Sequence, residues 1–233
     1  MKKVLITGGS RGIGEQCVKD FSELGYKVYF TYNKNKEKAE QISKETGAVA
    51  LKCDISISDE VDKIKEIGDI DILINNAGIS EIKMFQDIKE TDWDRMFDVN
   101  IKGMFLVTKA VIDGMIRKKK GRIINISSMW GEVGASCEVH YSASKAAVIG
   151  FTKALAKEVA PSGITVNCVS PGVIMTEMNA HLTEDDINEL CEETPLMRVG
   201  TTSEVSKAVL YLADEKAGFV TGTVLPVNGG IIM

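Results

Sequence analysis

Short apolar runs alternate with amphipathic segments along the whole chain. Seven runs have the length of a strand: residues 4–7, 27–32, 49–53, 70–74, 122–127, 164–169 and 222–227. The segments between them follow helical periodicity at residues 17–24, 33–46, 61–67, 91–117, 141–159 and 203–214. Alternating strands and helices indicate parallel strands with right-handed crossovers and helices on both faces. The pattern therefore predicts a doubly wound α/β fold of about seven parallel strands, with any ligand at their carboxyl ends.

Two of the predicted helices have informative faces. In the first, Cys17, Val18, Phe21 and Leu24 lie on one apolar face. In the long helix Thr91 to Arg117, apolar residues are too widely distributed for one stripe, so part of its surface is expected to pack against another subunit. This predicts a homotetramer or a homodimer.

Composition limits the classes of protein to consider. A chain of 233 residues with 44% apolar residues and no Pro/Ser-rich linker predicts a single domain, residues 1–233. The net charge of −5 gives no reason to expect a nucleic-acid partner. Five scattered Cys without a C-x-x-C pair indicate reduced thiols and no metal site. The apolar start of the chain is too short for a signal peptide or a membrane span, so we expect a cytoplasmic protein.

A glycine-rich turn follows the first apolar run and opens the first helix. Its residues are Gly8, Gly9, Ser10, Arg11, Gly12, Ile13 and Gly14. Such a turn brings backbone N–H groups to a pyrophosphate at the positive end of the helix. The alternative is a turn whose glycines serve only tight packing of strand against helix.

The end of the second strand bears on the choice of cofactor. An NAD site usually places a carboxylate there for the ribose 2′-hydroxyl, whereas this chain has Tyr32 and Asn33. Lys34 and Lys36 follow, and Arg11 lies in the glycine turn. These cations suit a 2′-phosphate and predict NADPH, unless the lysines belong only to a solvated helix face.

Polar side chains with catalytic potential follow the fourth and fifth strands. Asn75-Asn76-Ala77-Gly78 ends the fourth, where it is either a ligand site or ordinary loop chemistry, and Ser128 follows the fifth. Tyr141 and Lys145 lie four residues apart at the start of a helix and share one face. A hydroxyl, a phenol and an ammonium can then converge to move a proton to or from a carbonyl oxygen.

Three further features allow two interpretations each. Asn100 lies within the long helix, where its amide serves either a neighbouring backbone group or catalysis. The cations of 117–120 complement a helix carboxyl end or form a docking patch for an acidic partner. The segment from Met175 to Glu193 reads as a mobile lid, and His181 within it as a surface residue rather than a catalyst.

Taken together, these motifs resemble the short-chain dehydrogenase/reductase family over essentially the whole chain, which implies a Rossmann fold. Residues 7–14 match the family's cofactor loop, 75–78 its strand-four motif, and Pro171, Gly172 and Thr176 the segment that holds the nicotinamide carboxamide. The resemblance implies a catalytic tetrad of Asn100, Ser128, Tyr141 and Lys145. It implies a cofactor site made of Gly8, Ser10, Arg11, Gly12, Ile13, Gly14, Tyr32, Asn33, Lys34, Asp54, Ile55, Asn76, Ala77, Gly78, Tyr141, Lys145, Pro171, Gly172, Val173 and Thr176.

The resemblance also implies roles for these residues. Tyr141 is expected to give its proton to the carbonyl oxygen, which Ser128 holds and polarises. Lys145 is expected to favour the phenolate and to bond the nicotinamide ribose, and Asn100 to complete a water-mediated proton relay. Asp54 and Ala77 are expected beside the adenosine.

Within the family the chain is similar to 3-oxoacyl-acyl-carrier-protein reductases of fatty acid biosynthesis, at residues 92–94, 195–200 and 227–230. That similarity implies an NADPH-dependent tetramer whose ketone is borne on an acidic carrier protein. The loop 127–139 instead resembles a branch that reduces a 5-aminopentanone group on a lysine of elongation factor P. In that loop, Trp130 and Glu132 either accommodate a cationic substrate arm or fix the loop itself.

The identity of the substrate and one function of a different class remain open at this stage. The substrate is an acyl thioester, a ketone on a protein or another small carbonyl compound. The alternative from a different class is an NADP(H)-sensing protein that kept the fold and lost catalysis. The presence of Ser128, Tyr141 and Lys145 together disfavours that alternative.

Overall fold

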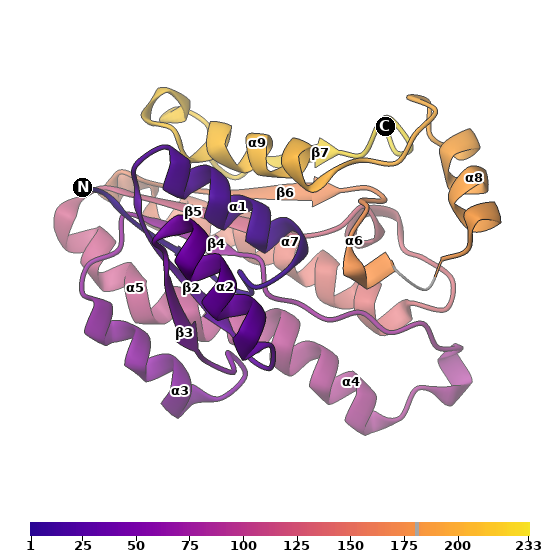
Figure 1. The fold of residues 1–233 in the computed structure, drawn as a ribbon, viewed down its shortest axis with the longest axis horizontal. Coiled ribbons are helices and arrows are strands. Elements are labelled where there is room, and N and C mark those ends of the chain that lie inside the picture. Colours follow the sequence, from indigo (N-terminus) through magenta and orange to yellow (C-terminus); the bar gives the residue numbers. More distant parts are fainter. Residues whose placement is uncertain (180–181) are drawn as a thin grey trace.

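A single parallel sheet runs through the computed structural model, which describes residues 1–179 and 182–233; His181 and our surface assignment for it lie outside the described residues. The sheet order is β3-β2-β1-β4-β5-β6-β7, with every pairing parallel (Figure 1). The predicted α/β Rossmann-type fold is thereby confirmed. The strand bounds are β1 Lys3–Ile6, β2 Lys27–Tyr32, β3 Val49–Lys52, β4 Ile72–Asn75, β5 Gly121–Ile126, β6 Ile164–Pro171 and β7 Val224–Val227.

The strand order reverses direction between β1 and β4, which are neighbours in the centre of the sheet. Leu5 of β1 pairs with Tyr29 of β2 on one side and with Leu73 of β4 on the other. Crossovers that leave this point in opposite directions open a crevice at the carboxyl ends of the two strands. The fold therefore puts the residues after Ile6 and after Asn75 side by side.

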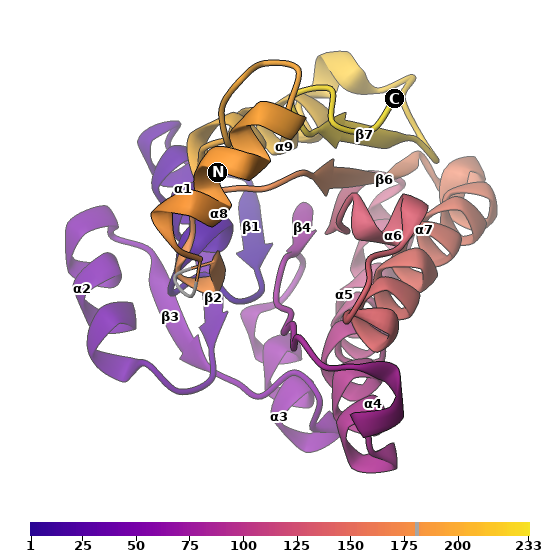
Figure 2. The same cartoon turned by 90° about the vertical axis from the view of Figure 1, so that its right-hand side faces the viewer.

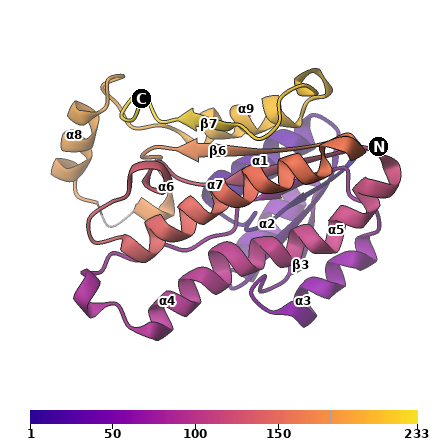
Figure 3. The same ribbon diagram turned by 180° about the vertical axis from the view of Figure 1, so that it is seen from behind.

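Helices cover both faces of the sheet. One face packs against α1, α2 and α9, and the other against α3, α5 and α7 (Figures 1 and 3). The main helices are α1 Gly12–Glu23, α2 Lys36–Thr46, α3 Ser58–Asp62, α4 Glu90–Phe97, α5 Met104–Lys118, α6 Trp130–Val133, α7 Val139–Val159, α8 Glu184–Glu193 and α9 Thr202–Ala213. Short 3₁₀ turns lie at Lys63–Ile67, Phe85–Asp87, Ala160–Ser162, Glu177–Asn179 and Glu215–Ala217. None of the described helices has the length and apolarity that crossing a membrane requires.

The apolar face of α1 lies mostly in the core. Cys17, Val18 and Phe21 are fully buried, whereas Leu24 is 62% exposed. Leu24 lies outside the core because the helix ends at Glu23 and the chain turns away at Gly25, whose φ is +76°.

The long helix predicted from Thr91 to Arg117 is interrupted by a π-helical turn. It comprises α4, the π-helix Asp98–Gly103 and α5 in direct succession. A π-turn inserts one extra residue and changes the face on which the following side chains lie. Asn100 lies within this turn and is 3% exposed.

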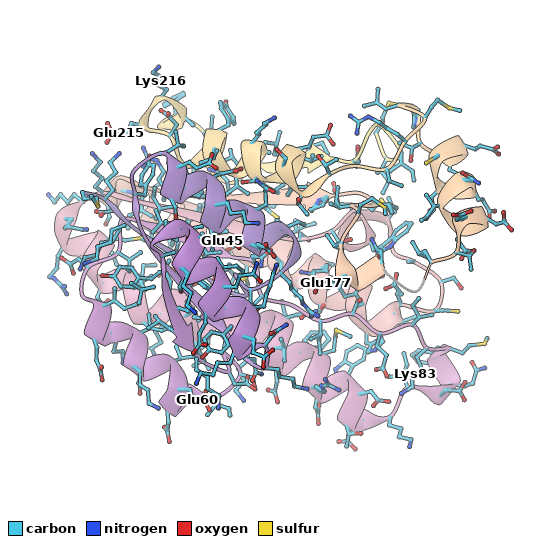
Figure 4. All side chains as sticks on the ribbon, viewed as in Figure 1. Glu45, Glu60, Lys83, Glu177, Glu215 and Lys216 are labelled. Atoms are coloured by element: carbon cyan, nitrogen blue, oxygen red, sulfur yellow. The ribbon has the colours of Figure 1, made fainter. Side chains whose placement is uncertain are left out.

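The cations that end α5 form ion pairs along the amino-terminal edge of the sheet. Arg117 pairs with Asp69 at 3.0 Å, Lys118 with Asp71 at 2.7 Å, and Lys120 with Glu215 at 2.8 Å. Figure 4 shows Glu215 at the end of the molecule opposite Lys83, which lies toward the carboxyl ends of the strands. These pairings support the structural interpretation of residues 117–120 over a docking patch.

Candidate active site

The glycine turn lies against the residues that follow β4. Gly8 adopts φ +66°, and a Cβ added to it would lie 2.9 Å from Ala77 Cα. A Cβ on Gly14 would lie 2.2 Å from the Gly8 carbonyl oxygen. Asn76 Nδ2 donates to the carbonyl oxygens of Thr7 at 2.9 Å and Gly8 at 3.1 Å. Tight packing therefore explains why residues 8 and 14 are glycines. Asn76 is hydrogen-bonded to the turn.

The amino terminus of α1 suits an anionic ligand. Its N-cap, Arg11, is extended and makes no side-chain cap hydrogen bond. The first-turn N–H groups of this twelve-residue helix therefore keep their positive field for a phosphate. Gly12 has φ +55°, and an added Cβ would lie 3.4 Å from the methyl group of Thr176. The turn thus fits a pyrophosphate, with Ser10 and Ile13 half-buried beside it.

The ends of β2 and β3 meet through a hydrogen bond between Asn33 Nδ2 and Asp54 Oδ2 at 2.7 Å. Burial raises the pKa of the Asp54 carboxyl, but hydrogen bonds from Ser56 and Asn33 outweigh it and bring the pKa below its usual range. The Lys34 charge acts in the same lowering direction. Asp54 is therefore ionised and held beside Asn33.

The other residues predicted at this edge have either exposed or buried side chains. Lys36 is 3.5 Å from Glu40 on its own helix, with a largely exposed side chain, so the solvated-face interpretation holds for it. Tyr32 is buried in the core. Ile55 is also buried and packs against Gly103, so its side chain belongs to the core rather than to a ligand site.

The strand-four motif is a hydrogen-bonded structure rather than ordinary loop chemistry. Asn75 Nδ2 donates to Thr108 Oγ1 at 3.0 Å and to Asn125 Oδ1 at 2.9 Å. The backbone N–H groups of Asn76 and Ala77 both donate to Thr7 Oγ1 at 3.0 Å. The segment after β4 is thereby tied to β1 and β5, the strands on either side of β4.

The Asn100 amide connects this segment to α7. Its Oδ1 accepts from the Ile79 N–H at 2.8 Å, and its Nδ2 donates to the Ile79 carbonyl at 3.0 Å and to Ser144 Oγ at 3.0 Å. A Cβ on Gly78 would lie 3.2 Å from Asn100 Oδ1 and 3.4 Å from Lys145 Nζ. The missing side chain of Gly78 thus leaves space between the amide and the ammonium.

Ser128 and Tyr141 meet at the end of β5, as predicted. Both are 8% exposed, and the Ser128 side chain lies near enough to the Tyr141 phenol to lower its pKa. The N–H of Trp130 donates to Ser128 Oγ at 3.2 Å. Burial raises the pKa of Tyr141 to about 12, despite the lowering effect of the Ser128 hydrogen bond.

Lys145 lies on the same face of α7 as Tyr141. Its Nζ is 5.7 Å from the centre of the Tyr141 ring and donates to the Ile126 carbonyl at 3.0 Å. Burial lowers the pKa of Lys145 to about 8. The net pKa shift of Tyr141 is upward because the effect of burial dominates, and the role expected of Lys145 toward the phenolate stays a prediction.

The segment after β6 lies beside the glycine turn. The Pro171 carbonyl accepts from Met129 N at 2.9 Å, and the Val173 carbonyl accepts from Gly200 N at 2.9 Å. A Cβ on Gly172 would lie 2.8 Å from Asn228 Cα. A cleft of about 570 Å³ separates this segment from α1, with Gly12 and Thr176 among its lining residues. It does not include the side chains of Ser128, Tyr141 or Lys145.

The loop 127–139 contains α6, a short helix that the apolar pattern did not reveal because it is only four residues long. Glu132 Oε1 accepts from Ser170 Oγ at 2.5 Å. This contact supports the loop-fixing interpretation of Glu132 over a direct contact with a cationic substrate arm. Trp130 is half-buried.

Sequence reasoning missed two features near this end of the molecule. His140 is fully buried beside Tyr141, with its Nε2 3.5 Å from Glu81 Oε2. The second feature is α8, which lies near the carboxyl ends of the strands (Figure 2) and is strongly acidic. It carries Glu184, Asp185, Asp186, Glu189, Glu192 and Glu193 and no Lys or Arg. The acidic run was visible in the sequence, but its position was not.

Comparisons with known proteins agree with this geometry. The family model described as short chain dehydrogenase matches residues 2–187. The 3-oxoacyl-[acyl-carrier-protein] reductase FabG of Staphylococcus epidermidis is 39% identical, with 100% of this chain and 99% of that protein covered. The acetoacetyl-CoA reductase of Shinella zoogloeoides is 40% identical over 97% of this chain and 96% of its own length. A crystal structure of 3-oxoacyl-[acyl-carrier protein] reductase from Brucella melitensis superposes with a TM-score of 0.95 at 35% identity, covering 100% of this chain and 91% of that one.

Proposed function

The chain belongs to the short-chain dehydrogenase family, and from that premise we propose that it is an NADPH-dependent reductase of 3-oxoacyl thioesters. It is an oxidoreductase that acts on the CH–OH/C=O group, and its family uses a nicotinamide cofactor. The specific choices of NADPH and of a 3-oxoacyl thioester are our proposals. The observation that supports carbonyl reduction is the buried pair Ser128 and Tyr141 beside Lys145, at the carboxyl end of β5.

In the proposed reaction, Ser128 and Tyr141 both bond the substrate's carbonyl oxygen. When bound, a nicotinamide cofactor would supply the hydride that reduces the carbonyl carbon. The Tyr141 hydroxyl gives its proton to the oxygen, and a pKa of about 12 keeps this phenol protonated at neutral pH, as the reduction direction requires. Ser128 Oγ accepts the Trp130 N–H, and this contact orients the hydroxyl so that it can donate its own proton in a hydrogen bond to the substrate oxygen.

After proton transfer, Tyr141 must recover a proton from solvent. Lys145, with a pKa lowered to about 8, is still mostly protonated at neutral pH and stabilises the phenolate as it forms. The space that Gly78 leaves between Lys145 Nζ and Asn100 Oδ1 suits the water-mediated relay proposed for Asn100. Asn100 then positions the relay, with its amide held by both backbone groups of Ile79.

Our proposal of NADPH rather than NADH rests on charge at the end of β2. Arg11 and Lys34 are exposed cations at the edge of the glycine turn and β2, where a 2′-phosphate would lie. Asp54, the carboxylate in this region, is held by Asn33 and Ser56. We propose that Asp54, Asn76 and Ala77 line the adenosine side, and that Pro171 to Thr176 lines the nicotinamide side.

A second candidate function is favoured by the acidic helix α8. An acidic acyl carrier protein would meet six carboxylates there, and like charges oppose association. A ketone on a cationic arm, such as 5-aminopentanone-modified lysine of elongation factor P, would meet a complementary charge. Both candidate functions use the same proton transfer. For either function, we propose a cytoplasmic location.

One experiment separates these functions. NADPH and NADH oxidation is measured in parallel with an acetoacetyl thioester and with aminopentanone-modified elongation factor P. Our proposal expects turnover with the thioester and a lower KM for NADPH than for NADH. Turnover only with the modified protein would establish the second candidate. Cofactor binding without oxidation against a wide panel of ketones would instead indicate a catalytically silent sensor.

A further inference from the structure

The short helix α6 touches the segments that carry the proposed chemistry. At its start, the Trp130 N–H donates to Ser128 Oγ, which belongs to the substrate side. Gly131 packs so closely on α7 that an added Cβ would lie 2.7 Å from the Lys145 carbonyl carbon. The Met129 N–H donates at 2.9 Å to the Pro171 carbonyl, on the proposed nicotinamide side. The turn is therefore a junction between β5, α7 and the end of β6.

One side chain of this turn reaches into the sheet. Glu132 Oε1 accepts the hydroxyl proton of Ser170 at 2.5 Å, and Ser170 is fully buried as the penultimate residue of β6. The rest of Glu132 is exposed, so the carboxylate could be solvated. It is instead held by a buried hydroxyl.

The residues that follow Ser170 have little freedom of their own. Pro171 has a fixed φ, and Gly172 donates its N–H to the Val227 carbonyl at 3.0 Å while packing against Asn228. A constraint applied at Ser170 is therefore passed directly to Pro171 and Gly172. On the other side, the same α6 turn orients Ser128. Glu132 thus joins the group that holds the carbonyl oxygen to the segment proposed to hold the nicotinamide.

We infer that Glu132 is a positioning residue: through Ser170 it fixes the distance between Ser128 and the Pro171–Gly172 segment. The inference rests on the proposed function, since that distance matters only if the carbonyl and the hydride donor meet there. A misplacement of about 1 Å can reduce a rate by about a hundredfold. Glu132 makes no contact with the reacting atoms in this role.

The test compares Glu132→Ala, Glu132→Gln and Ser170→Ala with the matched control Val133→Ala, whose exposed side chain is on the same turn. We expect Glu132→Ala and Ser170→Ala to lower kcat by about ten- to a hundredfold, with Tm and substrate KM near the wild-type values. Glu132→Gln should stay within about threefold of wild type, because its amide oxygen still accepts the Ser170 proton. The double variant E132A/S170A should be no slower than either single variant.

Three results would overturn the inference: wild-type kcat in Glu132→Ala, additive losses in the double variant, or a Glu132→Gln variant that fails through a raised substrate KM. The last result would mean that the carboxylate binds substrate directly.

Hydrogen exchange of the intact protein provides a readout that is independent of turnover. Amides of residues 172–176 should exchange faster in Glu132→Ala and Ser170→Ala than in wild type or Val133→Ala, and unchanged exchange would also reject the inference. If the wild-type protein reduces no ketone but this pattern holds, the proposed function fails while the positioning contact stands.

Discussion

At Tyr141, burial and the Ser128 hydroxyl act on the phenol in opposite directions. Burial dominates and raises its pKa to about 12, while the same burial lowers the pKa of Lys145 to about 8. The upward shift keeps the phenol protonated at neutral pH, and the downward shift brings the pKa of the Lys145 ammonium closer to neutral pH. At the scale of residues, these shifts support the proposed role of Tyr141 as the proton donor.

Replacing Tyr141 by Phe removes the proton donor and keeps the ring. We expect kcat to fall by about a hundredfold to ten-thousandfold, the usual contribution of a general acid. NADPH binding, followed by the change in cofactor fluorescence, should remain close to wild type. The control Tyr211→Phe changes an exposed phenol and should leave both quantities unchanged. Retained turnover in Tyr141→Phe would reject the role of Tyr141.

At the scale of elements, the π-turn between α4 and α5 determines where Asn100 lies. The extra residue of the turn brings the amide to the Ile79 backbone and to Ser144 of α7, so one side chain joins three segments. The backbone hydrogen bonds of a regular α-helix do not need a side-chain amide. The local irregularity therefore has a structural consequence at the site.

Asn100→Ala should destabilise the protein and also lower kcat. It leaves the N–H and carbonyl of Ile79 without their partner, which we expect to lower the unfolding free energy by about 2 kcal/mol. Urea unfolding measures this loss. The control Lys102→Ala lies in the same turn, where its surface pair with Asp98 should contribute less than about 1 kcal/mol. Equal stabilities for the two variants would contradict the bridging role.

For the whole molecule, exposed apolar side chains on α4 and α5 support our proposal of a homotetramer or homodimer. Trp93, Phe105 and Ile116 are 37%, 44% and 41% exposed. Light scattering should report an oligomer for the wild-type chain and a smaller species for Phe105→Asp, because a buried unpaired charge opposes association. Leu24→Asp, an equally polar change at another exposed position, should leave the oligomer intact. A monomeric wild-type chain would refute the proposal.

Buried thiols predict how the stability of the whole fold depends on pH. Burial raises the pKa of Cys17 and Cys168 to about 12 and that of Cys53 to about 11, from 9.0. A thiol whose folded pKa is raised stabilises the fold below the unfolded pKa, and this stability is lost as pH rises from 9 toward 12. Each thiol then contributes a loss of about 1.4 kcal/mol per pH unit.

Cys17→Ala tests this dependence. Between pH 9 and pH 11, unfolding in urea with a reductant should show a smaller loss of free energy for Cys17→Ala than for wild type, by about 1–2 kcal/mol. Cys191→Ala, at a partly exposed thiol, should follow the wild-type curve. Identical pH dependence in wild type and Cys17→Ala would show that the Cys17 thiol does not contribute.

The sequence by itself determined the fold class, the strands and the positions of Ser128, Tyr141 and Lys145, because these depend on local periodicity and on spacing within one helix. It also identified Asn100, but it did not show which groups the Asn100 amide contacts. Those signals come from residues close together in the chain, so they can be interpreted without knowing which segments are in contact.

Only the tertiary structure decided the properties that depend on contacts between distant segments. The upward pKa shift of Tyr141 comes from burial, and the Glu132–Ser170 contact joins residues 38 apart in the chain. Leu24 is exposed because the helix ends one residue before it. Such properties follow from packing across the sheet, which periodicity along the chain does not encode.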